Sequence, residues 1–148
     1  MQNQTEISKF AASSPKSGAP SNYAILLFGM LMFPIIFLVF FEARKRRTTA
    51  QEWEKSHYEL QYRSSKVFLL GILATILAAF AIFLTGGNQR QAEHTMMLIG
   101  LAAKLNYLLV GWVAVRSIRG LFLAGGQRAI GNPKSYWMWP SAAVPAPI

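Results

Sequence analysis

Residues 67–84 read VFLLGILATILAAFAIFL, and this stretch decides the fold class of the chain. Its only polar side chain belongs to Thr75, whose hydroxyl can bond back to its own helix. A helix needs about 20 largely apolar residues to cross a hydrocarbon core about 30 Å thick, so the stretch predicts a transmembrane helix. Gly71, Ala74 and Ala78 recur along it at spacings of three and four. That pattern favours close approach of a neighbouring helix, although small residues are also common in membrane helices generally.

Two further apolar stretches flank this one. Residues 23–41 read YAILLFGMLMFPIIFLVFF, with Pro34 as a tolerated kink, and the basic sequence after them is unlike the cleavage site of a signal peptide. Residues 96–115 read MMLIGLAAKLNYLLVGWVAV; they are long enough to cross but include Lys104, so a buried helix of a soluble domain is the alternative for them. Together the three stretches predict an all-α integral membrane protein with three transmembrane helices.

The composition agrees with this fold class. The chain has 148 residues, of which 53% are hydrophobic and 14% are charged, whereas about a quarter are charged in soluble proteins. Its net charge of +9 is typical of basic loops beside a membrane, while a nucleic-acid-binding protein usually carries far more Lys and Arg on a solvated face. The absence of cysteine excludes disulfides, thiolate catalysis and cysteine-ligated metals.

The chain divides into three regions. Residues 1–22 form a polar leader that is predicted to be disordered, because it has too little apolar surface to offset its chain entropy. Residues 23–133 form the membrane domain, and residues 134–148 form an aromatic and proline-rich tail. Within the membrane domain, residues 50–65 lack Gly and Pro and predict a short amphipathic cytoplasmic helix, whereas residues 85–95 predict a loop.

Lys and Arg are distributed unevenly between the two sides that three spans would create. One side holds residues 42–66, which contain seven Lys and Arg residues, and the segment from Arg116 onward, which contains four. The leader holds two and residues 85–95 hold one. By the positive-inside rule, the leader is expected outside and the C-terminus in the cytoplasm, with the chain in a bacterial inner membrane.

Trp53, His57 and Gln61 fall four residues apart on one face of the helix predicted over 50–65. One interpretation is that this face docks on the membrane-embedded part of the protein or on a partner. The alternative is a helix that lies on the membrane surface with solvated charges, where Trp and Tyr suit the headgroup layer. A metal shared by two histidines is disfavoured, because His94 is expected on the opposite side of the membrane.

Lys104 lies near the middle of the third stretch, where a charge costs about 2.5–3.5 kcal/mol on insertion scales. It shares a helical stripe with Gly100, Tyr107 and Gly111, and because glycines mark packing faces, Lys104 is expected to point into the bundle. No Asp or Glu lies inside the three stretches, so its partner would be carbonyls, Tyr107, water, an acidic group near the interface or another subunit. The alternative is a tolerated lysine whose ammonium reaches the membrane surface.

The basic run of Arg44, Lys45, Arg46 and Arg47 closely follows the first apolar stretch. It predicts a topology anchor that contacts anionic lipid headgroups, at about 1 kcal/mol per charge, in preference to a dedicated ligand site. No catalytic set is apparent, since Asp is absent and no phosphate-binding, dinucleotide-binding, zinc-protease or nucleophile-elbow motif occurs. We therefore expect no enzyme activity, no cofactor and no metal.

Three short motifs resemble a known family. They are W-x-x-x-H-Y-x-x-Q-x-R over 53–63, W-x-x-x-R-x-x-x-G over 112–120, and the glycine- and proline-bearing segment 126–133. The motifs resemble small uncharacterised bacterial membrane proteins that are distantly grouped with the Tic20-like subunit of the chloroplast protein-import translocon. The resemblance implies three or four membrane helices and no reaction. The residues expected to make packing or partner contacts are Trp53, His57, Gln61, Arg63, Lys104, Trp112 and Arg116.

The expected function is that of a non-catalytic accessory or assembly subunit of a larger inner-membrane complex. Its expected partners are the lipid bilayer and other membrane subunits, but not nucleic acid. Assembly with further copies of the same chain is compatible with this function. Three short helices enclose too little volume for a lone chain to transport a solute. The alternative is an oligomeric channel or carrier with Lys104 lining an anion path, and a membrane enzyme is the least favoured class.

Overall fold

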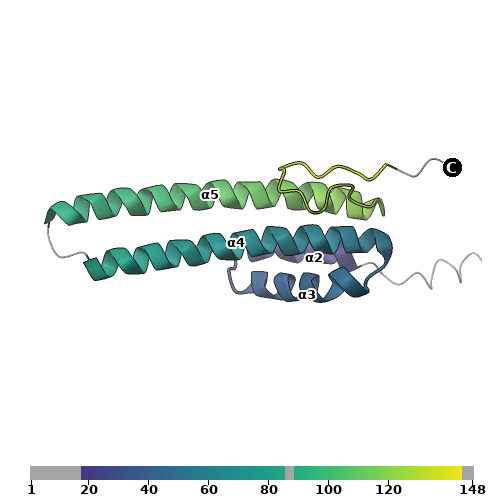
Figure 1. Ribbon diagram of the computed structural model, residues 1–148, viewed down its shortest axis with the longest axis horizontal. Coiled ribbons are helices and arrows are strands. Elements are labelled where there is room, and N and C mark those ends of the chain that lie inside the picture. The colour runs from purple at the N-terminus through teal and green to yellow at the C-terminus, as the bar shows by residue number, and fades with distance from the viewer. Residues whose placement is uncertain (1–17, 86–88, 145–148) are drawn as a thin grey trace, which may run out of the picture.

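The computed structural model describes residues 18–85 and 89–144, which form four helices and a C-terminal strap (Figure 1). The helices are α2 (Gly18–Gly29), α3 (Ile35–Thr49), α4 (Glu52–Thr85) and α5 (Gln89–Gly125). The strap, residues 126–144, is extended and lies back along α5. Apart from one isolated bridge, between Ile130 and Ala142, the described residues contain no β-structure, so the all-α class is confirmed.

The two long helices, α4 and α5, run antiparallel to each other along the whole molecule (Figure 1). Their 34 and 37 residues correspond to lengths of about 51 and 55 Å, well beyond a hydrocarbon core of about 30 Å. Both are long and apolar enough to cross a membrane over Glu52–Leu84 and Glu93–Gly125. In the most apolar part of each, 6% of the residues are buried, whereas the core helix of a soluble protein is mostly buried. The pair therefore favours a membrane protein with two such helices.

The prediction of three spans is wrong, because residues 23–41 fold into a helical hairpin. Helix α2 ends at Gly29 and α3 begins at Ile35, with Pro34 at the N-cap of α3. Gly29 packs against the first turn of α3, where a Cβ would lie 3.0 Å from the Ile36 nitrogen. At 12 residues, or about 18 Å, α2 is too short to cross a bilayer. Hydropathy alone does not distinguish a stretch that crosses from one that returns.

The hairpin brings its two ends to the same end of the molecule. A Cβ on Gly18, at the start of α2, would lie 2.8 Å from Nη1 of Arg46 near the end of α3. The chain therefore enters the described structure beside the basic run, next to Arg46. The predicted leader, 1–22, is also too long, because residues 18–22 are helical; residues 1–17 lie outside the described residues.

Helix α4 is continuous from Glu52 to Thr85, so the separate amphipathic helix predicted over 50–65 is instead the first half of a longer one. No Gly or Pro interrupts the sequence between residues 52 and 66, and nothing breaks the backbone ladder there. Helix α5 contains the predicted span 96–115 and begins seven residues earlier than that span, at Gln89. The loop predicted over 85–95 is therefore shorter, and residues 86–88 lie outside the described residues.

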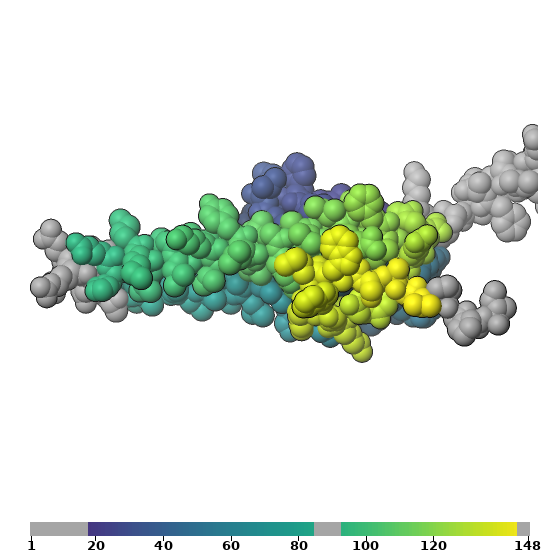
Figure 2. Space-filling view, turned by 90° about the horizontal axis from the view of Figure 1, so that it is seen from above, coloured from purple at the N-terminus to yellow at the C-terminus, as the bar shows by residue number. Residues whose placement is uncertain are grey.

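The buried core occupies one half of the molecule. There the hairpin and the strap cover α4 and α5, and Figure 2 shows the strap gathered toward one end. Core side chains come from all four helices and the strap: Tyr23, Leu26, Ile36, Val39, Tyr58, Leu60, Phe68, Val113, Leu123 and Ile130. We call this part the four-helix half. The remainder, residues 77–85 and 89–104, is the two-helix half, where α4 and α5 have only each other as neighbours (Figure 1).

Candidate functional site: a buried polar cluster in the four-helix half

His57 lies at the centre of a buried polar cluster between α2, α4 and the strap. The residue is completely buried, and its Nε2 lies 2.9 Å from the backbone carbonyl oxygen of Arg128. Its Nδ1 lies 3.2 Å from the hydroxyl of Tyr23, whose ring also meets the imidazole edge-on. A carbonyl can only accept, so Nε2 carries the proton and Nδ1 of the neutral ring accepts from Tyr23. The imidazole thus links the strap to the hairpin.

Gln61, one turn further along α4, holds the first turns of α2. Its Oε1 accepts a hydrogen bond of 2.6 Å from Nδ2 of Asn22, and its Nε2 donates one of 3.0 Å to the carbonyl of Ala19. All of these groups are buried, and a buried amide that lost its partners would cost about 1–3 kcal/mol. The pairing of two amides therefore fixes the register between α2 and α4.

Arg116 joins α5 to the strap from the other side of the cluster. It is 1% exposed, and its Nε donates to the Ser64 hydroxyl on α4 at 3.2 Å. Its Nη2 donates to the Ser135 carbonyl at 2.9 Å, and its Nη1 donates to the carbonyl of Trp137. The guanidinium also lies over the Trp112 ring, 4.7 Å from its centroid. One buried cation thus connects α4, α5 and the strap.

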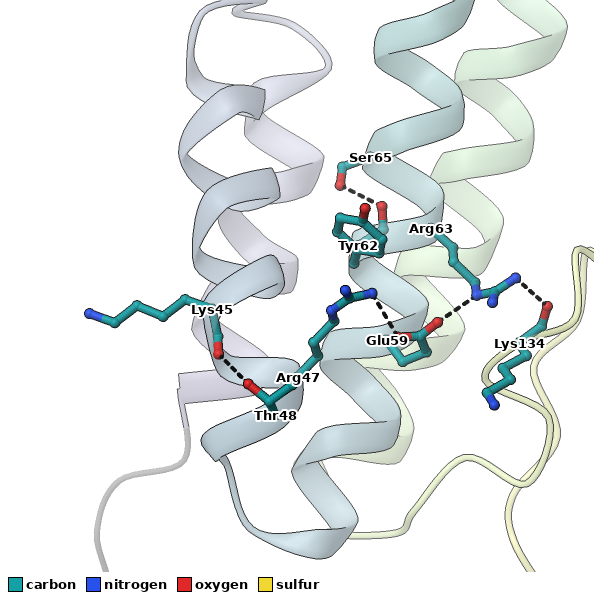
Figure 3. A network of polar contacts seen from close by, with 8 residues as sticks. All are labelled: Lys45, Arg47, Thr48, Glu59, Tyr62, Arg63, Ser65 and Lys134. Atoms are coloured by element: carbon teal, nitrogen blue, oxygen red, sulfur yellow. Dashed lines mark hydrogen bonds and ion pairs between the residues drawn. The ribbon is translucent and has the colours of Figure 1, made fainter.

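A second network surrounds Glu59 at the surface beside the cluster (Figure 3). The Glu59 carboxylate pairs with Arg63 on its own helix at 2.6 Å and with Arg47 of α3 at 3.6 Å. Arg63 in turn donates to the carbonyl of Lys134 in the strap at 3.0 Å. Arg47 lies over the Tyr62 ring, with 4.4 Å between its guanidinium carbon and the ring centroid. This surface network therefore connects the hairpin, α4 and the strap, as the buried cluster also does.

The residues predicted from spacing on α4 meet in this region. His57 and Gln61 are buried inside the chain, so the alternative of a solvated surface helix is wrong for this face. Trp53 is partly buried, with its ring 5.7 Å from that of His57. From α5, Arg116 reaches α4 through Ser64, three residues after Gln61, and Trp112 donates to the carbonyl of Tyr136 at 3.2 Å.

Lys104 lies apart from these residues, and the prediction that it points into the bundle is wrong. The side of α5 that faces α4 carries Asn106, whose Nδ2 donates to the Thr75 hydroxyl at 2.7 Å. Lys104 precedes Asn106 by two residues, which places it on nearly the opposite face of α5, and it is exposed there. The glycines that suggested a packing face are open, since a Cβ on Gly100 or Gly111 would meet nothing within 4 Å. Gly71 of α4 does face α5, against the side chain of Leu109.

The basic run is not a uniform anchor. Arg46 forms an ion pair with Glu42 and lies 3.5 Å from the Tyr58 hydroxyl, and Arg47 pairs with Glu59. The Tyr58 hydroxyl and, less strongly, the Glu42 carboxylate raise the pKa of Arg46. Arg44 and Lys45 are exposed and make no ion pair with the described residues.

The arrangement holds segments of the chain in position relative to one another. The cluster's side chains bind carbonyls, hydroxyls and amides, and each contact joins two segments that are distant in sequence. Among the described residues, no group of three His, Cys, Asp or Glu could hold a metal ion. What the geometry provides is a fixed relation between the hairpin, the two long helices and the strap.

The sequence analysis missed several members of the cluster. Asn22 was assigned to the leader and Tyr23 to the first predicted transmembrane stretch, although two hydrogen-bonding side chains at the start of an apolar stretch are a usable signal. The strap acceptors are backbone carbonyls of Arg128, Ser135 and Trp137, and these leave no trace in the sequence.

Comparisons of the chain with protein-family models, with curated proteins and with solved structures give no match.

Proposed function

We propose that this protein is a non-catalytic membrane protein that assembles with other membrane subunits through the outward face of α5. The observation that carries the proposal is the position of Lys104. Its ammonium stands on an exposed face of an apolar helix, and it makes no ion pair with any described residue. A partner that supplies a carboxylate or carbonyl oxygens would pair with this ammonium.

The depth of Lys104 makes a lipid-facing position costly. If the hydrocarbon core covers residues 96–115, Lys104 lies about 12 Å from the nearer end, at 1.5 Å per residue. A lysine near the centre of a membrane helix costs about 2.5–3.5 kcal/mol on insertion scales. A carboxylate on another helix would offset that cost, because ion pairs in a low dielectric are strong when their geometry is good.

The residues around Lys104 suit a neighbouring helix. Gly100 and Gly111 lie on the same face, and nothing stands within 4 Å of a Cβ placed on either of them. Glycines at a helix surface let another backbone approach closely. Tyr107, three residues after Lys104, is 77% exposed and offers a hydroxyl on this side of the helix. The face thus combines close approach with polar groups that a partner helix can bind.

The rest of the molecule supports a role as a platform for assembly. The polar cluster satisfies itself and holds the four-helix half together, while the two-helix half leaves apolar side chains such as Leu77, Phe83 and Met96 exposed. The distant Tic20-like resemblance, which also points to a subunit of a larger complex, is part of this proposal. The proposal also includes a bacterial inner-membrane location in which the basic end of the molecule, with the strap, faces the cytoplasm.

The test is co-purification of the Lys104→Met variant in mild detergent, followed by native mass spectrometry. Lys66→Met is the matched control, since Lys66 is also exposed but lies at the start of the apolar stretch of α4. We expect the wild-type and Lys66→Met proteins to retain a membrane subunit at fixed stoichiometry. Lys104→Met should lose it, and Lys104→Arg should keep it.

Two results would contradict this function. Full retention of every partner by Lys104→Met would reduce Lys104 to a tolerated lysine. A wild-type complex made only of copies of this chain, whose Lys104→Met form keeps its size but loses anion flux in vesicles, would favour the oligomeric channel. Lys104 faces outward, so such a channel would need a path between copies.

A further inference from the structure

A groove runs along the α2–α3 hairpin, and Asn22 of the polar cluster is among its lining residues. Its volume is about 480 Å³. One end is polar and is lined by Ser21, Glu42, Lys45 and Arg46, while the other is apolar and is lined by Ile25 and Leu38. At 1.5 Å per residue, Leu38 lies about 10 Å along α3 from Lys45, so the groove separates its polar and apolar ends clearly.

The polar end has a net positive charge and one cation that is not engaged. Arg46 is paired with Glu42 and contacts Tyr58. Lys45 makes no ion pair with the described residues, and Figure 3 shows its side chain extending away from α4. A bound anion would therefore find the Lys45 ammonium available, the Arg46 guanidinium at its side and the exposed Ser21 as a hydroxyl donor.

The apolar end is open. Ile25 is 40% exposed and Leu38 is 67% exposed, although both belong to a hairpin whose inner side is fully packed. Burial of apolar surface stabilises by about 25 cal/mol per Å², so an apolar chain along these residues would bind favourably. Along the groove, the lining thus changes from cationic to apolar in the same order as a phospholipid changes from headgroup to acyl chain.

We propose that this groove binds one anionic phospholipid, with its phosphate on Lys45 and Arg46 and an acyl chain along Ile25 and Leu38. The charge of the polar end selects an anionic over a zwitterionic headgroup. The position agrees, because the basic run marks the end of the hairpin that would lie at the membrane surface. The inference rests on the membrane location proposed above but not on a partner at Lys104, so the two can fail separately.

The basic run contains its own control for the charge. Arg44 precedes Lys45, is also exposed and also makes no ion pair with the described residues, but it does not line the groove. A diffuse electrostatic anchor would respond alike to the loss of either residue. A built site would respond to Lys45 and not to Arg44. For the apolar end, Leu31 at the hairpin tip is 83% exposed and also lies outside the groove.

The experiment measures phosphatidylglycerol bound per protein, in competition with phosphatidylcholine, by native mass spectrometry of the full chain from nanodiscs. Lys45→Gln should lower the preference by up to about fivefold, the effect of losing one direct ion pair at an exposed site, and Arg44→Gln should not. Leu38→Trp should fill the apolar end and reduce binding with the charge unchanged, while Leu31→Trp should not. Thermal midpoints in detergent confirm that each variant is folded.

Three outcomes would overturn the inference. Equal losses for Lys45→Gln and Arg44→Gln would assign the preference to general surface charge. No loss for Leu38→Trp would show that the acyl chain does not use the groove. Competition by glycerol phosphate as effective as that by the whole lipid would make this a site for a soluble anion.

Discussion

Replacement of Arg116 by Met removes the cation that joins α4, α5 and the strap while keeping an apolar stem of similar length. Three hydrogen bonds are lost, to Ser64 and to the carbonyls of Ser135 and Trp137. Hydrogen bonds from a charged donor contribute about 1.5–3 kcal/mol each. The gain from no longer burying a charge offsets part of this, so we expect a net loss of about 2–4 kcal/mol.

The loss should appear first as release of the strap. The strap carries trypsin sites after Arg128 and Lys134, and both residues have carbonyls that accept hydrogen bonds from α4. A change of about 2 kcal/mol alters an opening equilibrium by about 30-fold. In mild detergent, Arg116→Met should therefore be cleaved at these two positions at least tenfold faster than the wild-type protein, by that scale of effect.

Arg119 provides the matched control, one turn along the same helix. It lies over the ring of Trp139 in the strap, 5.3 Å from its centroid, but its Nε has no hydrogen-bond partner among the described residues. A cation–π contact of this kind contributes about 0.5–1 kcal/mol, so Arg119→Met should change cleavage only slightly. Equal cleavage of Arg116→Met, Arg119→Met and wild-type protein would refute the role assigned to Arg116.

Two further substitutions test the contacts between the hairpin and the long helices through the free energy of unfolding in an SDS titration. Tyr23→Phe should lower the free energy of unfolding by about 1–2 kcal/mol, because Nδ1 of His57 loses its hydrogen-bond donor. The control Tyr107→Phe, on the exposed face of α5, should change it little. Equal effects of the two substitutions would argue against the hydrogen bond. Gly120→Ala should cost about 1–3 kcal/mol, because the new Cβ would overlap the Tyr23 ring. Gly111→Ala, where nothing stands within 4 Å, should be neutral or stabilising, and the same sign for both glycines would contradict the packing.

Parts of the fold that follow from continuous local patterns were predictable. Residues 67–84 are apolar apart from Thr75, and they form the second half of α4. Residues 96–115 lie within α5 despite Lys104. The periodicity of Trp53, His57 and Gln61 marked a face of α4 that the structure places at the polar cluster. In each case the signal lies within a few helical turns.

The hairpin was not predictable from the same reasoning, because its cause is not local. Residues 23–41 have the length and hydropathy of a span, and Pro34 is compatible with either a kink or a turn. The hydrogen bonds that hold α2 against α4 join distant residues, such as Asn22 and Gln61, which are 39 positions apart in the chain. The orientation of Lys104 was misjudged for a related reason. Its face is set by the contact of Asn106 with Thr75 on another helix.

The hairpin is tested most directly by cysteine labelling, because the native chain contains no cysteine. Single cysteines are placed at Ser21 near the start of α2, at the exposed Glu93 near the start of α5, and at Val144 in the strap, which is 88% exposed. A membrane-impermeant maleimide should label Ser21→Cys and Val144→Cys from one side of the membrane and Glu93→Cys from the other. Labelling of Ser21→Cys from the same side as Glu93→Cys would show that residues 23–41 cross the membrane, and it would contradict the two-span architecture.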